Sequence, residues 1–74
     1  MSEQYLINNL RLYRVSRDLS QAELAEHAGV SRKTISAIEN ASTHPSVMLA
    51  LILAQVLDAS VEDLFSLTNA SDSF

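Results

Sequence analysis

Apolar residues recur at helical spacing along most of the chain, and short polar breaks separate the apolar stretches. Leu6, Leu10 and Tyr13 share one face of the first stretch, which predicts a helix over residues 7–17. Four further stretches predict helices at 21–28, at 32–39, from Ser46 to Leu57, and around Ser60 to Phe65. The pattern therefore predicts an all-α domain built from these helices.

Gly29 is the only glycine of the chain and lies between the second and third predicted helices. Glycine adopts a left-handed backbone conformation at little cost, which suits a helix end followed by a tight turn. Ala25 stands at the expected crossing point of the two helices and is small enough to allow their close approach. Ser20 begins a capping box, and Ser31 is a second capping serine. Together these features predict a helix-turn-helix over 21–40.

The helix-turn-helix lies within a longer pattern that resembles a known domain. The segments SQAELAEHAGVSR, TISAIEN, HPS and SVEDLF together resemble the helix-turn-helix domain of the phage Cro and lambda-repressor family, also called the xenobiotic-response-element type. The resemblance covers residues 8–65 and places residues at the family's small, glycine and apolar positions: Ala25, Gly29, Val30, Ile35 and Ile38. It implies a five-helix lambda-repressor-like DNA-binding domain.

The length of 74 residues leaves room for one domain, which we assign to 1–74, with a core over 6–67 and a tail at 69–74 that frays. Related small regulators sometimes pair their ends, so a short strand pairing of 5–7 with 66–68 is an open alternative. The sequence has no secretory signal, no membrane-spanning stretch and no cysteine. We therefore expect a cytoplasmic protein without disulfides.

The net charge of −4 argues against nucleic acid, because phosphate contacts need Lys or Arg. The distribution of charge changes this picture. Residues 40–74 contain four acids and no Lys or Arg, whereas all five basic residues lie before residue 34, namely Arg11, Arg14, Arg17, Arg32 and Lys33. We expect a basic helix-turn-helix end with moderate, strongly salt-sensitive affinity for duplex DNA.

The predicted helix at 32–39 corresponds to the recognition helix, whose N-terminal residues meet base edges in the major groove. Arg32 and Lys33 are the predicted base readers, since Arg grips guanine through two hydrogen bonds and Lys reaches the same acceptors or a phosphate. Ser36 and Ala37, one turn further on, are candidates for a base edge and a thymine methyl group. Candidates for backbone or mixed contacts are Gln21, Ser31, Thr34, Asn40, Thr43, His44 and, more weakly, Arg11.

Arg14 is expected to have a structural role. Its family counterpart pairs with the glutamate near the end of the recognition helix, so the resemblance implies a salt bridge to Glu39. His27 and His44 are far apart, with no acid in motif spacing, and indicate no metal site. No motif points to catalysis, a cofactor or a small-molecule ligand, and we expect a protein that is not an enzyme.

Two further features depart from the family pattern. Relatives usually have Gly-Arg or Gly-Lys after Asn40, where this chain has Ala41 and Ser42, so one charge that would neutralise a phosphate is missing. The fourth predicted helix is apolar almost all round, and relatives tend to carry polar residues on one of its faces. That face forms an apolar stripe, which we expect to act as a homodimer interface, from Met48, Ile52 and Val56, joined by Ala59 and Leu67. The open alternative is that the tail, with Leu67 and Phe74, covers this stripe within one chain.

The sequence therefore predicts a sequence-specific duplex-DNA-binding transcriptional regulator, a repressor that acts as a homodimer on a pseudo-palindromic operator. The competing hypothesis is a protein-interaction module, such as an antitoxin-like or anti-repressor partner, that uses the apolar stripe. Net acidity favours the second hypothesis, whereas Arg32 and Lys33 at the head of a complete recognition helix favour the first.

Overall fold

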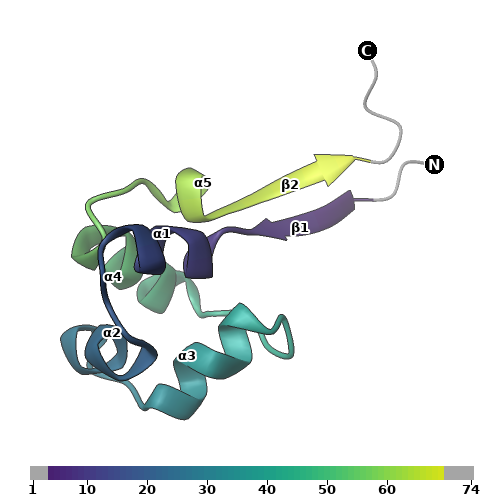
Figure 1. Ribbon diagram of the computed structural model, residues 1–74. Helices are drawn as coiled ribbons and strands as arrows, with labels where there is room; N and C mark the ends of the chain where they lie inside the picture. The colour runs from purple at the N-terminus through teal and green to yellow at the C-terminus, as the bar shows by residue number, and fades with distance from the viewer. Residues whose placement is uncertain (1–3, 70–74) are drawn as a thin grey trace.

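The computed structural model describes residues 4–69. Within this range the chain forms five helices and a two-stranded antiparallel sheet, which confirms the predicted fold class and its strand alternative. Figure 1 shows the helices packed together and the two strands projecting from them as a ribbon. In chain order the elements are β1 Gln4–Asn8, α1 Leu10–Ser16, α2 Gln21–Ala28, α3 Arg32–Glu39, α4 Val47–Val56, α5 Val61–Leu64 and β2 Phe65–Asn69.

The start of the first helix was predicted wrongly. The expected helix began at Ile7, but this residue lies in β1, opposite Ser66 of β2, and α1 begins only at Leu10. Asn8 is the last residue of β1, and its side chain links the strand to two helices: its oxygen accepts from the Leu10 N–H at 3.1 Å and its amide donates to the Ile38 carbonyl at 2.7 Å. The strand partner lies about sixty residues away along the sequence, so local periodicity could not show it.

The core is formed by apolar side chains from all five helices. Ala25 is buried where α2 packs against α3, as its small size predicts. Leu6, expected beside Leu10 on the first helix, instead lies on the ribbon and is partly exposed. The buried residues that pack together are Leu10, Leu24, Ala25, Ala28, Ile35, Ile38, Leu53, Ala54, Leu57 and Leu64.

The helices begin and end with recurring local motifs. Serine side chains cap α2, α3, α4 and α5 by accepting an N–H from the third residue of each helix. Each of the first four helices is followed, within two residues, by a residue with left-handed backbone conformation. The N–H of the next residue then donates a hydrogen bond to the carbonyl five residues before it. These left-handed residues are Asp18 (φ 58°), Gly29 (φ 75°), Ala41 (φ 60°) and Asp58 (φ 51°).

Among these four positions, Gly29 and Ala41 are the most informative. A Cβ atom added at Gly29 would meet nothing within 4 Å, so the left-handed conformation, and not close packing, is what favours glycine there. Ala41 adopts the same conformation without a polar side chain to hydrogen-bond locally, which costs an L-residue about 1 kcal/mol or more. The end of α3 is therefore strained at Ala41.

We expect Ala41→Gly to raise the free energy of unfolding by about 0.5–1 kcal/mol, because glycine relieves the left-handed strain and loses only part of this gain to backbone entropy. Urea denaturation followed by circular dichroism measures the change. Gly29→Ala is the matched control and is expected to lower stability by a similar amount. A lower stability of Ala41→Gly would contradict this account of the α3 end.

Candidate nucleic-acid interface

The helices α2 and α3 lie together at the edge of the molecule opposite α5 and β2 (Figure 1). Ile35 and Ile38 bury the inner face of α3 in the core, which fixes the opposite face toward solvent. Arg32 and Lys33 are exposed at the N-terminal end of this helix. Ser36 and Ala37 follow one turn later and are half-buried. The structure thus brings together the four side chains predicted to face base edges.

Three of the five basic residues are bound within the protein. Arg14 donates from Nε to Glu39 at 2.6 Å, and Arg11 donates from Nε to the same side chain at 3.2 Å. Arg17 donates to the Leu57 carbonyl at 2.9 Å and also lies 5.6 Å from the centre of a tyrosine ring on α1. These three side chains therefore hold helix ends together.

Arg32 and Lys33 differ from the other three cations, because within residues 4–69 neither side chain forms a hydrogen bond or an ion pair. Both lie in the first turn of α3, where the helix dipole is positive and where no acidic side chain is present. A cation at this end of a helix costs about 0.3–1 kcal/mol. An anionic ligand would offset this cost, so the arrangement is suited to phosphate or to the acceptors of a base edge.

Ser31 and Thr34 are occupied by the local structure of the α3 N-terminus. The Ser31 hydroxyl accepts from the Thr34 N–H at 3.1 Å, and the two hydroxyl groups share a hydrogen bond at 2.9 Å. Their first role is therefore to cap the recognition helix. Any contact with DNA would use the hydroxyl donor or acceptor positions that these hydrogen bonds leave open.

Glu39 is the centre of the hydrogen-bond network behind this face. Its side chain is fully buried and forms the salt bridge to Arg14 that the resemblance implied. It also accepts from Arg11 at 3.2 Å and from the Gln21 amide at 3.1 Å. Arg14 in turn donates to the Leu19 carbonyl at 2.7 Å. One carboxylate thus connects α1, the N-terminus of α2 and the C-terminus of α3.

The network keeps Glu39 ionised. Burial alone would raise the pKa of its carboxyl, but the hydrogen bonds from Arg14, Gln21 and Arg11 outweigh burial and hold the pKa below its ordinary value. The hydrogen bond to Glu39 raises the pKa of Arg14 in the same way, against the effect of its own burial. The two groups therefore form a stable buried ion pair.

Three predicted phosphate contacts have side chains that are bonded within the protein. The Gln21 amide donates to Glu39, and Arg11 donates from Nη2 to the Asn40 side-chain oxygen at 3.2 Å. The sequence predicted only Arg14 as the partner of Glu39, and the hydrogen bonds from Gln21 and Arg11 to Glu39 were not predicted. The residues concerned lie 18 and 28 positions from Glu39, so no local pattern could show that they meet.

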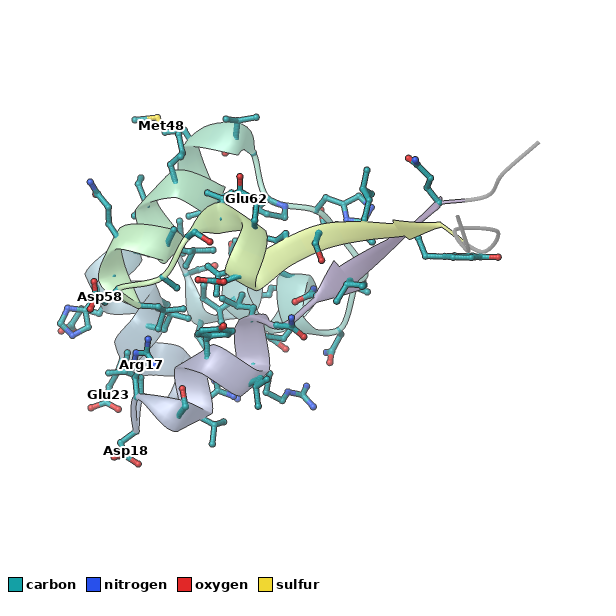
Figure 2. All side chains as sticks on the ribbon, turned by 90° about the horizontal axis from the view of Figure 1, so that it is seen from above. Arg17, Asp18, Glu23, Met48, Asp58 and Glu62 are labelled. Carbon is teal, nitrogen blue, oxygen red and sulfur yellow. The ribbon has the colours of Figure 1, made fainter. Side chains whose placement is uncertain are left out.

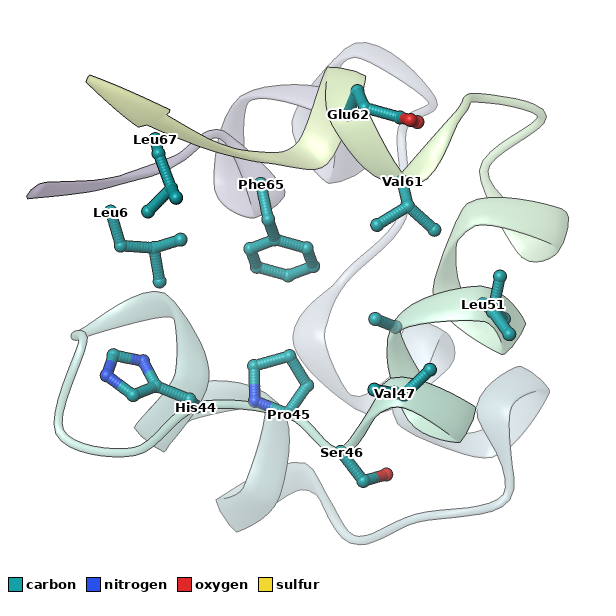
Figure 3. Close-up of a pocket in the computed structure, with 11 residues that line it drawn as sticks. Leu6, His44, Pro45, Ser46, Val47, Leu51, Val61, Glu62, Phe65 and Leu67 are labelled. Carbon is teal, nitrogen blue, oxygen red and sulfur yellow. The ribbon is translucent and has the colours of Figure 1, made fainter. Parts of the chain in front are cut away.

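Thr43 and His44, also predicted to contact the DNA backbone, are exposed in the loop between α3 and α4. His44 lies at the edge of an apolar groove beside Leu6 and Pro45 (Figure 3). The structure therefore places it between the recognition helix and the β1–β2 ribbon.

The apolar stripe expected on the fourth helix is only partly exposed. Ile52, Val56 and Ala59 are partly buried and pack against the core of the same chain. Met48 is exposed and points away from α4 (Figure 2). Leu67 is exposed on β2, while the proposed covering residue Phe74 lies outside the described residues.

The helix α4 has neighbours on more than one side. Both α2 and α5 pack against it, so an apolar pattern almost all round the helix does not show which side stays open. The exposed apolar residues of α4 are Val47, Met48 and Leu51.

A short α2, a left-handed turn at Gly29 and a recognition helix headed by two free cations define a helix-turn-helix DNA-binding domain. Comparison with known proteins agrees, because the family described as Helix-turn-helix matches residues 10–64. The chain is 43% identical over 58 residues to an uncharacterised HTH-type transcriptional regulator of Methanocaldococcus jannaschii, which covers 78% of this chain and 88% of that protein.

Two other similarities support the same assignment. The control protein C.SmaI of Serratia marcescens is 34% identical over 64 residues, which is 86% of this chain and 76% of that protein. The crystal structure of SinR, the master regulator for biofilm formation, in complex with DNA matches with a TM-score of 0.69 and 36% identity, over 73% of this chain and 87% of that chain. The chain therefore belongs to the helix-turn-helix family of transcriptional regulators, which bind DNA and are not enzymes.

Among residues 4–69, no helix is long and apolar enough to cross a membrane. The same residues contain no group of His, Asp and Glu side chains that could hold a metal ion.

The Glu39 network predicts how stability depends on pH. The pKa of Glu39 is lower in the folded than in the unfolded chain, where it is about 4.3, so its contribution is present above that pH and is lost as pH falls through the folded pKa. We expect Glu39→Gln to lower the free energy of unfolding by about 1–3 kcal/mol at neutral pH. As the pH falls further, the stability of the variant should decrease less than that of wild type, because the variant has no carboxylate at this position to protonate. Urea denaturation at several pH values measures both effects.

Glu26→Gln, which changes an exposed glutamate of α2, is the matched control for this experiment. If Glu39→Gln and wild type lose stability in parallel as the pH falls, the proposed ionised network is wrong.

Arg32 and Lys33 lie at a helix N-terminus, where positive charge suits an anionic ligand but lowers the stability of the free protein. We expect Lys33→Glu to raise the free energy of unfolding by about 0.3–1 kcal/mol, because an anion interacts favourably with the helix N-terminus where the lysine does not. Thermal and urea denaturation measure the gain, which should shrink in high salt because the interaction is electrostatic. A variant less stable than wild type would show that Lys33 has a structural role.

Proposed function

We propose that this protein represses transcription by occupying a pseudo-palindromic operator as a homodimer. The observation that carries the proposal is that Arg32 and Lys33 are presented together at the exposed head of α3 and are bound to no described residue. The similarity to SinR, whose structure contains DNA, supports the same use of this helix.

In this proposal the N-terminal half of α3 enters the major groove. The Arg32 guanidinium donates two hydrogen bonds to guanine N7 and O6, a contact of about 1–3 kcal/mol of discrimination, and Lys33 donates to a base acceptor or a phosphate. Ser36 and Ala37 meet the next base pairs along the groove. Because burial of Ile35 and Ile38 fixes the orientation of the helix, these contacts need little reorganisation.

Phosphate contacts would flank α3 on both sides. On one side, the Glu39 network holds Gln21 at the first turn of α2, where backbone N–H groups and the helix dipole favour a phosphate. On the other side, Asn40, Thr43 and His44 lie in or beside the loop after α3. Arg11 remains mostly exposed while it donates to Asn40, and its free N–H groups add positive charge at that edge.

The charge of a single subunit favours binding to DNA as a dimer. With only two uncommitted cations and a net charge of −4, one chain makes few phosphate contacts and binds weakly. Two chains related by a two-fold axis double these contacts and place two recognition helices about 34 Å apart, in successive major grooves. Occupancy of such an operator blocks access of the polymerase, which is the proposed mechanism of repression.

A protein-interaction module remains the second candidate function. The exposed apolar residues Val47, Met48 and Leu51, together with the acidic C-terminal half, favour it. The free cations on α3 have no role in that function, which is why we prefer DNA binding.

Selection of bound fragments from random duplex DNA tests the proposed function. We expect wild type to recover a motif with two inverted half-sites about 10–11 base pairs apart, centre to centre. Arg32→Ala should relax specificity at one position of each half-site, and Lys33→Ala should lower affinity and, for a phosphate contact, reduce the salt slope by about 1. Gln55→Ala, an exposed change on α4, is the control. Failure of wild type to recover any shared motif would overturn the proposal.

A further inference from the structure

Asn8 lies where the β1–β2 ribbon meets the helices, and its side chain spans this junction. Its backbone is opposite Phe65 in the strand register, at the end of β1 from which the chain enters α1 (Figure 1). Its side-chain oxygen accepts from the Leu10 N–H in the first turn of α1, and its amide donates to the Ile38 carbonyl in the last turn of α3. One carboxamide therefore connects the ribbon, α1 and the recognition helix.

The hydrogen bond to Ile38 closes the C-terminal end of α3 from outside the helix. Carbonyl groups in the last turn of a helix lack the N–H partners that a following turn would supply. The Ile38 carbonyl accepts from the Ala41 N–H at 3.0 Å, and the Asn8 amide uses its second lone pair at 2.7 Å. Asn8 and Ile38 are 30 positions apart along the chain, so this cap ties the end of the recognition helix to a distant element.

This end of α3 has a strained backbone that depends on such restraints. Ala41 adopts a φ of 60°, which is unfavourable for an L-residue. Glu39 restrains the last turn from the side of α1 and α2, and Asn8 restrains it from the side of the ribbon. Without the Asn8 amide, relaxation of the strain at Ala41 would shift the loop that follows α3.

The neighbouring Asn9 makes a similar hydrogen bond with a different helix. Its side-chain amide donates to the Asp63 carbonyl of α5 at 3.2 Å, and both asparagines are partly buried. The two residues therefore resemble each other in type, burial and position beside the start of α1. They differ because the Asn8 amide bonds to the recognition helix and the Asn9 amide bonds to α5.

We infer that Asn8 is a positioning residue for DNA binding, because its amide fixes the C-terminal turn of the recognition helix before DNA is bound. The candidate phosphate contacts at this end are Asn40, Thr43 and His44, and their contact with DNA rests on the proposed function. Side chains on an ordered turn lose less freedom on binding, so the restraint from Asn8 favours affinity. The restraint itself belongs to the free protein and does not depend on that proposal.

Asn8→Asp tests this role, because it keeps the oxygen that accepts at the start of α1 and replaces the amide donor with an oxygen that the Ile38 carbonyl repels. Asn9→Asp is the matched control, since it adds the same charge beside the same helix N-terminus. Amide hydrogen exchange is followed by NMR on the full chain without DNA. In Asn8→Asp, we expect the amides of Ala41 and Ser42 to exchange at least about tenfold faster than in the control.

Fluorescence anisotropy with duplex DNA is the second measurement. The probe is the duplex that wild type selects from random DNA, or a random-sequence duplex at low salt if wild type selects none. We expect Asn8→Asp to bind this probe at least about tenfold more weakly than Asn9→Asp, although the two variants have the same net charge. A residue that contributed only to global stability would not separate the two folded variants in this way.

Circular dichroism establishes that each variant is folded. Asn8→Ser, whose hydroxyl can still accept at the start of α1, replaces Asn8→Asp if that variant is unfolded, with Asn9→Ser as its control. If neither Asn8 variant folds, the role of Asn8 is structural and the inference is overturned.

Three results in the folded variants would also overturn the inference: exchange at Ala41 and Ser42 equal to that of the control, faster exchange in all helices alike, or equal affinity for DNA. A wild type that selects no shared motif would instead overturn the proposed operator. The exchange rates and the binding at low salt would still decide the role of Asn8.

Discussion

The buried carboxylate of Glu39 connects the three helices that carry the DNA-binding face. It accepts hydrogen bonds from Arg14 and Arg11 of α1 and from Gln21 of α2, while its own backbone belongs to the last turn of α3. A buried charge is costly unless it is paired and hydrogen-bonded, so these donors must remain in place whenever the domain is folded. The relative positions of α1, the first turn of α2 and the recognition helix therefore follow from the satisfaction of one charge.

The five basic residues divide between structure and function. Three arginines are held by Glu39 or by backbone carbonyls at helix ends, whereas Arg32 and Lys33 have no partner among the described residues. The second pair lies at the helix end where positive charge is least favourable. A chain selected only for stability would place acids there, as α2 and α5 do in their first turns. The two cations at the start of α3 have no such acid beside them and no partner among the described residues, which suits an anionic ligand such as DNA.

Features that act within one helical turn could be read from the sequence. Ser20, Ser31 and Gly29 place the ends of α2 and α3 because their effects reach only a few residues along the chain. The start of α1 was missed because Ile7 pairs with a strand near the other end of the chain. The cover over Ile52 and Val56 was missed for the same reason, since it depends on how α2 and α5 pack around α4. The helix ends that position the candidate site were therefore predictable, whereas its internal hydrogen-bond partners and the open apolar surface were not.

The acidic net charge fits the proposal that two subunits bind DNA together. A molecule with charge −4 and two free cations has little attraction for random DNA, so a single subunit spends little time on wrong sites. In the proposed homodimer, the two sets of contacts would add only where both half-sites are present at the correct spacing. The specificity of the proposed regulator would then come from the spacing of two weak contacts, because neither subunit alone has enough free positive charge to bind tightly.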